Sequence, residues 1–120
     1  MRKFFPSLCL LSMVSTGAFA QQSWTPAQSG TSAELRGLSV VSASVVWASG
    51  ARGTVLRTTD GQHWQAMSVP GAEKLDFRDI HAVDASTALV MSAWPGDASR
   101  VMLTDDGGKS WREVALNRYK

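Results

Sequence analysis

The chain has 120 residues, of which 44% are hydrophobic and 18% are charged, as in an ordinary globular protein. This composition excludes a long disordered tail and a coiled coil. The formal charge of +2 includes Arg2 and Lys3 near the N-terminus. Without these two, the remaining basic residues balance the 10 acidic ones, so the net charge gives no support to a nucleic-acid partner.

Residues 1–20 have the features of a cleaved secretory signal. Basic residues at the start precede a mostly apolar run over residues 4–14, and small residues lie at positions 18 and 20. The apolar run is too short for a membrane-spanning helix, which needs about 20 residues. We therefore expect cleavage after Ala20, a periplasmic or secreted protein, and no membrane span. Cys9, the only cysteine, lies in this leader, so the mature chain has no thiol for a disulfide.

The mature part of the sequence contains an internal repeat. Residues 35–46 match residues 77–88 at an offset of 42, and both copies begin with an apolar residue followed by an arginine. Residues 55–64 match residues 102–111 at an offset of 46 to 47, and a loop insertion around residues 94–97 explains the change. A repeat of about 40 to 50 residues is typical of propeller blades.

Each copy contains short runs rich in β-branched and aromatic residues, separated by clusters of Gly, Ser, Asp or Pro. These runs predict four strands per copy, and no window outside the leader has a helical period. The expected strands cover residues 38–41, 45–48, 54–58 and 64–69 in the first copy, and 80–83, 88–92, 100–103 and 111–116 in the second. The sequence therefore predicts an all-β protein with about two four-stranded antiparallel blades of an incomplete propeller.

The expected organisation has four parts. They are a signal peptide at 1–20, a linker or ring-closing strand at 21–34 that includes Trp24, a first blade at 35–70, and a truncated second blade at 71–120. Closed propellers contain about four to eight blades. Two blades therefore predict either the N-terminal fragment of a longer propeller or self-assembly of several copies into one ring. A truncated product without an independent function is the remaining alternative.

A turn motif follows the third strand of each copy. Residues 104–111, TDDGGKSW, fit the pattern S/T-x-D-x-G-x-x-W, and residues 58–64, TTDGQHW, repeat it with one glycine fewer. An aspartate in such a turn accepts backbone N–H groups further along the chain, and a glycine permits a positive φ. We expect structural roles for Thr58, Asp60, Gly61 and Trp64 in the first motif, and for Thr104, Asp106, Gly108 and Trp111 in the second.

Calcium binding is an alternative role for the adjacent Asp105 and Asp106. The sequence lacks the D-x-D-x-D-G loop with a distal Glu that such a site uses. His63 and His81 are each isolated from other metal-ligating residues in the sequence. We therefore expect no metal and no other cofactor.

The two turn motifs resemble the Asp-box, or BNR, repeat. Together with Trp24, Trp47 and residues 53–56, they make the region from 24 to 114 similar to the Asp-box propellers of the photosystem II assembly and stability factor family, the Ycf48-like group. The resemblance implies an exported, non-enzymatic β-propeller module that binds a protein partner or a small ligand. It implies no link to photosynthesis, because similar sequences occur in exported proteins of bacteria that do not photosynthesise.

Arg36 and Arg78 recur at one position of the repeat, just before an inner strand. Inner strands line the central channel of the propellers that this sequence resembles, so repeated arginines there can bind acidic groups of a partner or ligand. A structural pairing with a neighbouring aspartate or carbonyl is the alternative. Trp94, in the loop insertion, is the third candidate binding residue, whereas Trp47 is expected in the core.

The sequence does not predict an enzyme. Sialidases also contain Asp boxes, and residues 77–80, FRDI, resemble their F-R-I-P segment at the first two positions only. A sialidase needs a Tyr and Glu nucleophile pair in addition to three arginines, and the only tyrosine here is Tyr119. A sialidase-like or glycosyl hydrolase fragment is therefore the less favoured alternative, and no catalytic residue is assigned.

Overall fold

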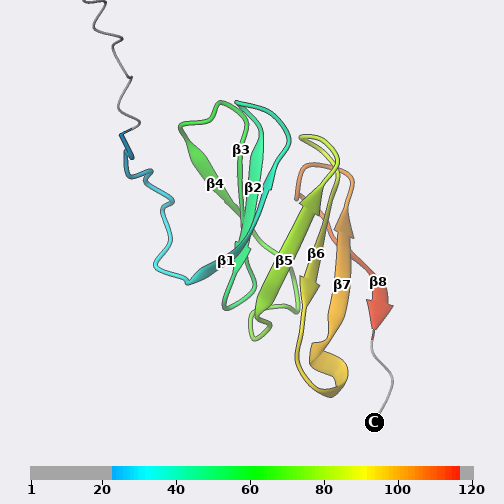
Figure 1. Ribbon diagram of the computed structural model, residues 1–120. Coiled ribbons are helices and arrows are strands. Elements are labelled where there is room, and N and C mark those ends of the chain that lie inside the picture. The colour runs from blue at the N-terminus through cyan, green and yellow to red at the C-terminus, as the bar shows by residue number, and fades with distance from the viewer. Residues whose placement is uncertain (1–22, 117–120) are drawn as a thin grey trace, which may run out of the picture.

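The computed structural model describes residues 23–116, which form two four-stranded antiparallel sheets lying side by side (Figure 1). The first sheet contains β1 (Leu35–Val40), β2 (Val46–Gly50), β3 (Thr54–Thr58) and β4 (Trp64–Met67), in that order. The second contains β5 (Phe77–Ala82), β6 (Ala88–Ser92), β7 (Arg100–Thr104) and β8 (Arg112–Leu116), in the same order. A short 3-10 helix, η1 (Gly96–Ala98), lies between β6 and β7. The predicted leader and its cleavage after Ala20 lie outside the described residues.

The eight predicted strands and the all-β fold class are confirmed. In each sheet, every strand pairs with the strand that follows it in the sequence, as in a propeller blade. β3 and β6 have the predicted bounds, whereas β1 and β5 each begin three residues earlier than expected. Both early starts contain a register shift, between Leu35 and Gly37 and between Phe77 and Asp79. Each early start contains an arginine followed by a glycine or an aspartate and no β-branched residue, so the runs from which the strands were predicted did not include it.

Residues 23–34 form no strand and lead into β1 along the first sheet (Figure 1). Ala27 and Ser29 border a hollow on the side of this sheet that is turned away from the second sheet. Trp24 is almost completely exposed. Within residues 23–116, no helix has the length and apolar character needed to cross a membrane.

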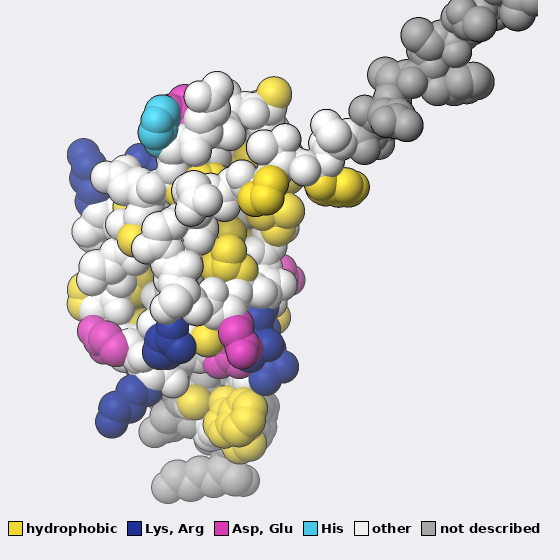
Figure 2. Space-filling model, turned by 90° about the vertical axis from the view of Figure 1, so that its left-hand side faces the viewer, with side chains coloured by type: hydrophobic (Ala, Val, Ile, Leu, Met, Phe, Trp, Pro, Cys, Tyr) yellow, Lys and Arg dark blue, Asp and Glu magenta, His cyan; other side chains and the backbone are white. Residues whose placement is uncertain are grey.

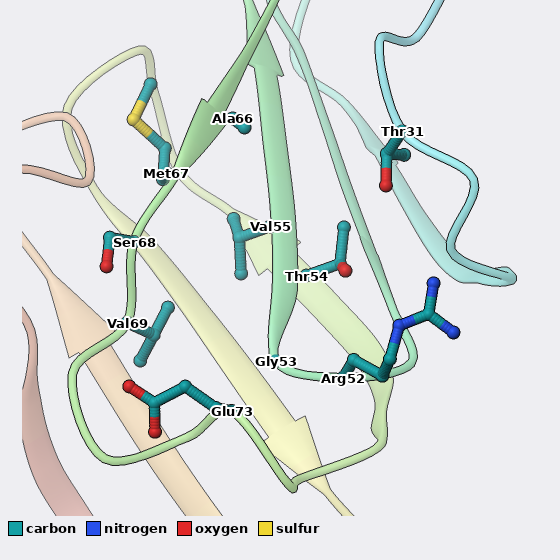
Figure 3. Close-up of a pocket in the computed structure, with 10 residues that line it drawn as sticks. All are labelled: Thr31, Arg52, Gly53, Thr54, Val55, Ala66, Met67, Ser68, Val69 and Glu73. Atoms are coloured by element: carbon teal, nitrogen blue, oxygen red, sulfur yellow. The ribbon is translucent and has the colours of Figure 1, made fainter.

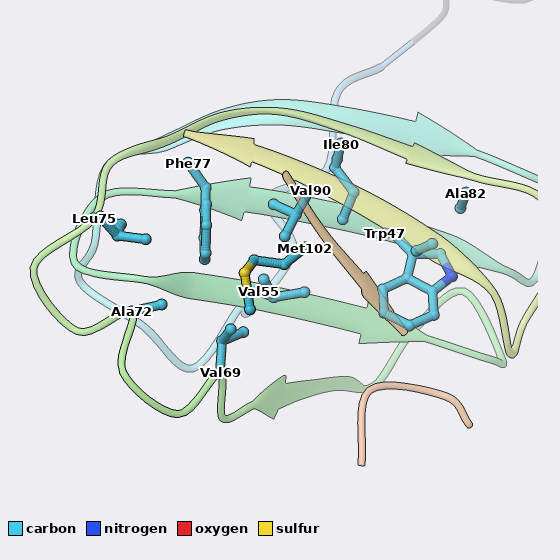
Figure 4. Packing of buried hydrophobic residues seen from close by; sticks show 11 residues of the cluster. Trp47, Val55, Val69, Ala72, Leu75, Phe77, Ile80, Ala82, Val90 and Met102 are labelled. Carbon is cyan, nitrogen blue, oxygen red and sulfur yellow. The ribbon is translucent and has the colours of Figure 1, made fainter. Parts of the chain in front are cut away.

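The hydrophobic core lies between the two sheets, where β1 and β2 pack against β5 (Figure 4). Trp47 and Val55 of the first sheet and Phe77 and Val90 of the second have no exposed surface. Side chains alternate between the two faces of a strand, so Trp47 and Val55 point toward the second sheet and their neighbours point to the opposite face. Burial of these large side chains between the sheets therefore holds the two blades together.

Close backbone contact between β1 and β5 depends on Gly37. A Cβ atom at this position would lie only 3.0 Å from the Cα of Asp79 and 3.0 Å from the backbone nitrogen of Ile80. The hydroxyl of Ser39 accepts a hydrogen bond of 2.9 Å from the backbone N–H of Ala82. The innermost strands of the two sheets are thus joined by both van der Waals contact and a hydrogen bond.

Candidate functional site

Arg36 of β1 and Arg78 of β5 meet at one carboxylate. Nε of Arg36 lies 2.7 Å from Oδ1 of Asp76, and Nε of Arg78 lies 3.3 Å from Oδ2 of the same residue. Nη2 of Arg36 also donates to Glu34 at 3.0 Å. The two predicted arginines are therefore close together in space, and both pair with a neighbouring acid.

Asp76 was not identified from the sequence, although the repeat contained a signal for it. Glu34 precedes Arg36 by two positions, and Asp76 precedes Arg78 by two positions, so the offset of 42 extends to an acidic residue in each copy. Each arginine pairs with the acid of its own copy. Arg36 also reaches the acid of the next blade, whereas Arg78 has no corresponding second acid among residues 23–116.

Trp94 lies beside Arg78. The guanidinium carbon is 5.9 Å from the centre of the indole ring, which is within cation–π range. Trp94 precedes η1 and is 62% exposed, and its backbone N–H donates to the hydroxyl of Ser99 at 3.2 Å. A hollow of about 270 Å³ is bordered by Trp94, Asp76 and Lys74. The three predicted binding residues therefore surround Asp76 at one end of the paired blades.

This cluster is open to solvent and contains more basic than acidic groups. The side chain of Arg78 is 45% exposed and that of Arg36 is 36% exposed, compared with 24% for Asp76. Lys74 adds a third basic group to the same end of the molecule. In Figure 2, basic and acidic side chains lie next to one another toward the lower end of the molecule. The cluster can therefore attract an additional carboxylate.

Another hollow, of about 240 Å³, lies between β3 and the chain that leaves β4 (Figure 3). Val55 and Met67 form part of its wall, and Arg52 and Glu73 lie at one end. No predicted site residue borders this hollow. The predicted binding residues therefore point to the cluster around Asp76 instead.

The first turn motif binds its own backbone. Oδ1 of Asp60 accepts the N–H groups of Gln62 at 2.8 Å and His63 at 2.7 Å. The hydroxyl of Thr58 accepts the N–H of Gly61 at 3.0 Å, and Gly61 has a φ of 76°. Because hydrogen bonds from His63 and Gln62 favour the ionised carboxylate, they lower the pKa of Asp60 well below its usual range.

The second turn motif has the same arrangement with one additional residue in the turn. Asp106 accepts hydrogen bonds from the hydroxyl and the backbone N–H of Ser110, and these lower its pKa to about 2. The hydroxyl of Thr104 accepts the N–H of Gly108 at 2.8 Å, and Gly108 has a φ of 88°.

The calcium alternative for Asp105 and Asp106 needs further ligands nearby. Within the described part of the chain, no cluster of three or more His, Cys, Asp or Glu side chains could hold a metal ion.

The tryptophans that close the two motifs have different surroundings. Trp111 packs edge to face against Trp47, with ring centres 6.4 Å apart, and its indole N–H donates to the carbonyl of Gly108. Trp64 instead borders a hollow on the free side of the first sheet. Both rings are partly exposed, but only Trp111 links its motif to the core between the sheets.

Arg57 joins the two sheets and was missed in the sequence. Its Nη1 donates to the carbonyl of Ala85 at 2.7 Å, and its guanidinium lies 5.5 Å from the ring centre of Trp47. The counterpart of Arg57 in the second copy is Leu103. Because the arginine does not recur, the repeat gave no indication of this role.

No family model and no curated protein matches the sequence. A solved structure of Ycf48 bound to a D1 peptide is similar to this chain, with a TM-score of 0.62 at 22% sequence identity. The match covers 80% of this chain and 32% of the other, so this chain spans about a third of the length of that relative. The two sheets therefore have the fold of propeller blades, as part of an incomplete propeller.

Proposed function

We propose that the protein is an exported, non-enzymatic binding module, and that Arg78 and Trp94 take a carboxylate from a protein partner. The observation that carries this proposal is the different environment of two equivalent arginines. Arg36 pairs with Asp76 of the following blade, but the matching place beside Arg78 has no acid among the described residues. A carboxylate from another molecule fits that place.

The chemistry of the cluster suits a carboxylate attached to an apolar group. The planar guanidinium of Arg78 offers paired N–H donors, and its ion pair with Asp76 uses Nε. An exposed ion pair alone contributes only about 0 to 1 kcal/mol, so useful affinity requires further contacts. Trp94 and the adjoining hollow provide an apolar surface for those contacts. We therefore expect the partner to present an acidic group next to an apolar side chain.

Two observations support a protein partner and a binding role. The similar Ycf48 structure holds a D1 peptide, so a chain with this fold can bind a peptide. Asp76 and Glu34 are both engaged by arginines, which suits a binding surface better than a site with a free general base. Export is supported by the basic start, apolar run and small residues of positions 1–20.

The binding proposal is tested with a fluorescent peptide that has an apolar residue, two aspartates and a free C-terminal carboxylate. Fluorescence anisotropy should show binding, and Arg78→Ala should weaken it about tenfold or more, since a charge-assisted hydrogen bond is lost. Arg78→Lys should bind less well than wild type, because lysine lacks the planar fork. Arg112→Ala removes an exposed arginine from β8 and is the matched control.

Two results would contradict this proposal. One is binding by Arg78→Ala that equals wild type, and the other is equal binding of this peptide and of a version that has two asparagines and an amidated C-terminus, and therefore no carboxylate. Export is tested separately by N-terminal sequencing of the protein recovered from the periplasm or medium. The mature chain should begin at Gln21.

A further inference from the structure

We propose that a second copy of this chain is the partner of the Arg78 site. We call the face of each sheet that is turned away from the other sheet its free face. The copies dock head to tail, so that the free face of β1–β4 in one copy covers the free face of β5–β8 in the next. The inference rests on the proposed function, because it names the carboxylate that Arg78 takes, that of Glu34 in the second copy. The contact between the two sheets within one chain provides the template.

Residues at equivalent positions of β1 and β5 have very different exposures. Ile80 and Ala82 of β5 face the first sheet and are only 4% and 9% exposed. Their counterparts in β1 are Leu38 and Val40, each 65% exposed. Leu38 borders the hollow on the face of the first sheet that is turned away from the second, and Val40, two residues further along β1, lies on the same face. Hydrophobic side chains reach the surface on this side of the molecule (Figure 2). This face thus presents the apolar positions that are buried between the blades.

The opposite face of the second sheet offers a complementary surface. Trp47 and Val55 are completely buried at the contact between the sheets, and their counterparts Leu89 and Val101 are only partly buried. Leu89, Val101 and Met91 border a hollow of about 200 Å³ on this face. Apolar side chains that project from β1 of another copy can fill it, as those of β5 fill the internal contact.

Charges at the edge of the two faces are also complementary. Within the chain, Asp76 of the second blade pairs with Arg36 of the first. Glu34 holds the repeat position of Asp76 and has a side chain that is 76% exposed, while Arg78 holds the position of Arg36. Head-to-tail docking that repeats the internal contact therefore places Glu34 of one copy beside Arg78 of the next.

The free face of the second sheet differs from the internal contact at several positions, and one of them controls how closely another strand can approach. Gly37 lets β5 approach β1 closely, and its counterpart in the second copy of the repeat is Asp79. Asp79 borders the hollow on the free face of the second sheet. Its side chain limits the approach of another strand, so Asp79→Gly should strengthen the association.

A head-to-tail contact joins two different surfaces, and it closes into a ring only if the rotation between copies permits. Closed propellers contain about four to eight blades. Each chain supplies two blades, so a ring of this kind contains about two to four copies. Association should therefore stop at a defined mass.

The test measures the mass of the exported chain, residues 21–120, by light scattering over a wide range of concentration. Wild type should form an oligomer, whereas Leu38→Glu and Met91→Glu, which each place a charge on one face, should both be monomeric. An equimolar mixture of these two variants retains one intact face of each kind, so it should form a dimer and nothing larger. Gln62→Glu adds a charge at an exposed turn position and is the control.

Each other outcome overturns the second-copy assignment. Wild type that remains monomeric at the highest concentration shows that the faces do not bind each other. Dimers of Met91→Glu alone show that identical faces pair, and a native particle made of one longer polypeptide assigns the faces to further blades of that chain. Two further variants provide independent readings. Asp79→Gly should lower the concentration at which the oligomer dissociates, and Glu34→Gln should raise it. An unchanged dissociation concentration for both variants contradicts the docking geometry.

The same samples separate this inference from the proposed function. Leu38→Glu leaves Arg78 and Trp94 in place and uncovered, so this monomer should bind the acidic peptide. Wild type should bind the peptide at concentrations at which the oligomer dissociates, because Glu34 of the next copy otherwise occupies Arg78. A monomeric wild type that binds the peptide through Arg78 overturns only the second-copy assignment. Failure of the peptide to bind the Leu38→Glu monomer instead overturns the carboxylate site itself.

Discussion

The indole Nε1 of Trp47 donates a hydrogen bond of 3.1 Å to the carbonyl oxygen of Asp84, so a fully buried ring of the first sheet holds the β5–β6 hairpin of the second. The carboxylate of Asp84 accepts the N–H groups of Ser86 and Thr87 within this hairpin, and these bonds lower its pKa. In the first copy, the hydroxyl of Ser42 accepts the equivalent N–H groups. The hairpin geometry is therefore the same in both blades, although the acceptor differs.

Replacement of Trp47 should destabilise the contact between the sheets. Trp47→Phe keeps most of the buried area but leaves the carbonyl of Asp84 without this donor, so we expect a loss of about 1 to 3 kcal/mol in the free energy of unfolding. Trp47→Ala should cost about 3 to 5 kcal/mol, because it also creates a cavity. Urea denaturation followed by circular dichroism measures both. Trp94→Phe, at an exposed position, is the control, and equal losses at the two positions would contradict the assignment.

The strands could be predicted because their pattern is local. Runs such as Thr54–Thr58 are rich in β-branched residues and are bounded by turn residues, and the structure has the predicted bounds there. The starts of β1 and β5 could not be predicted in the same way, since each contains a bulge that shifts the register. A bulge changes hydrogen bonding between strands, and this change leaves no distinct pattern in one sequence.

The site could be predicted only in part. Arg36 and Arg78 were found because they recur, and Trp94 because it lies in an insertion. The ion pairs of both arginines with Asp76 depend on how β1 packs against β5, and no local pattern in the sequence indicates that packing. The role of Arg57 also depends on that packing, and its replacement by leucine in the second copy removed the one signal that the repeat offers.

Gly37→Ala should weaken the contact between the blades. The added Cβ would lie 2.5 Å from Oγ of Ser49 and 3.0 Å from Cα of Asp79, so the strands must move apart. We expect a loss of about 1 to 3 kcal/mol in the free energy of unfolding, the usual cost of overpacking. The double variant Gly37→Ala, Ser49→Ala should recover only part of this loss relative to Ser49→Ala alone, because the backbone of Asp79 stays in place. Complete recovery in chemical denaturation would show that only the hydroxyl obstructs.

Asp106→Ala should lower the melting temperature more than Asp105→Ala. Asp106 accepts hydrogen bonds from Ser110 and from the hydroxyl of Thr104, so its loss leaves the donors of this turn without their acceptor. Asp105 is the exposed neighbour in the same turn and provides a control with the same change in charge. Thermal unfolding of the two variants measures the difference. Equal melting temperatures would mean that the turn does not depend on the Asp106 carboxylate.

The contribution of Asp106 to stability should disappear at acid pH. Its pKa is lowered from 3.8 to about 2 in the folded protein by hydrogen bonds from Ser110, so the unfolded chain takes up a proton first as the pH falls. The stabilising contribution is therefore complete above the unfolded pKa of 3.8 and is lost progressively as the pH falls through about 2. Asp60 has a pKa shifted in the same direction, but it titrates equally in wild type and in Asp106→Asn. The difference in melting temperature between these two proteins should be largest near neutral pH and should shrink toward pH 2, as thermal unfolding at a series of pH values will measure. A difference that stays constant through this range would show that the ionised form of Asp106 does not stabilise the turn.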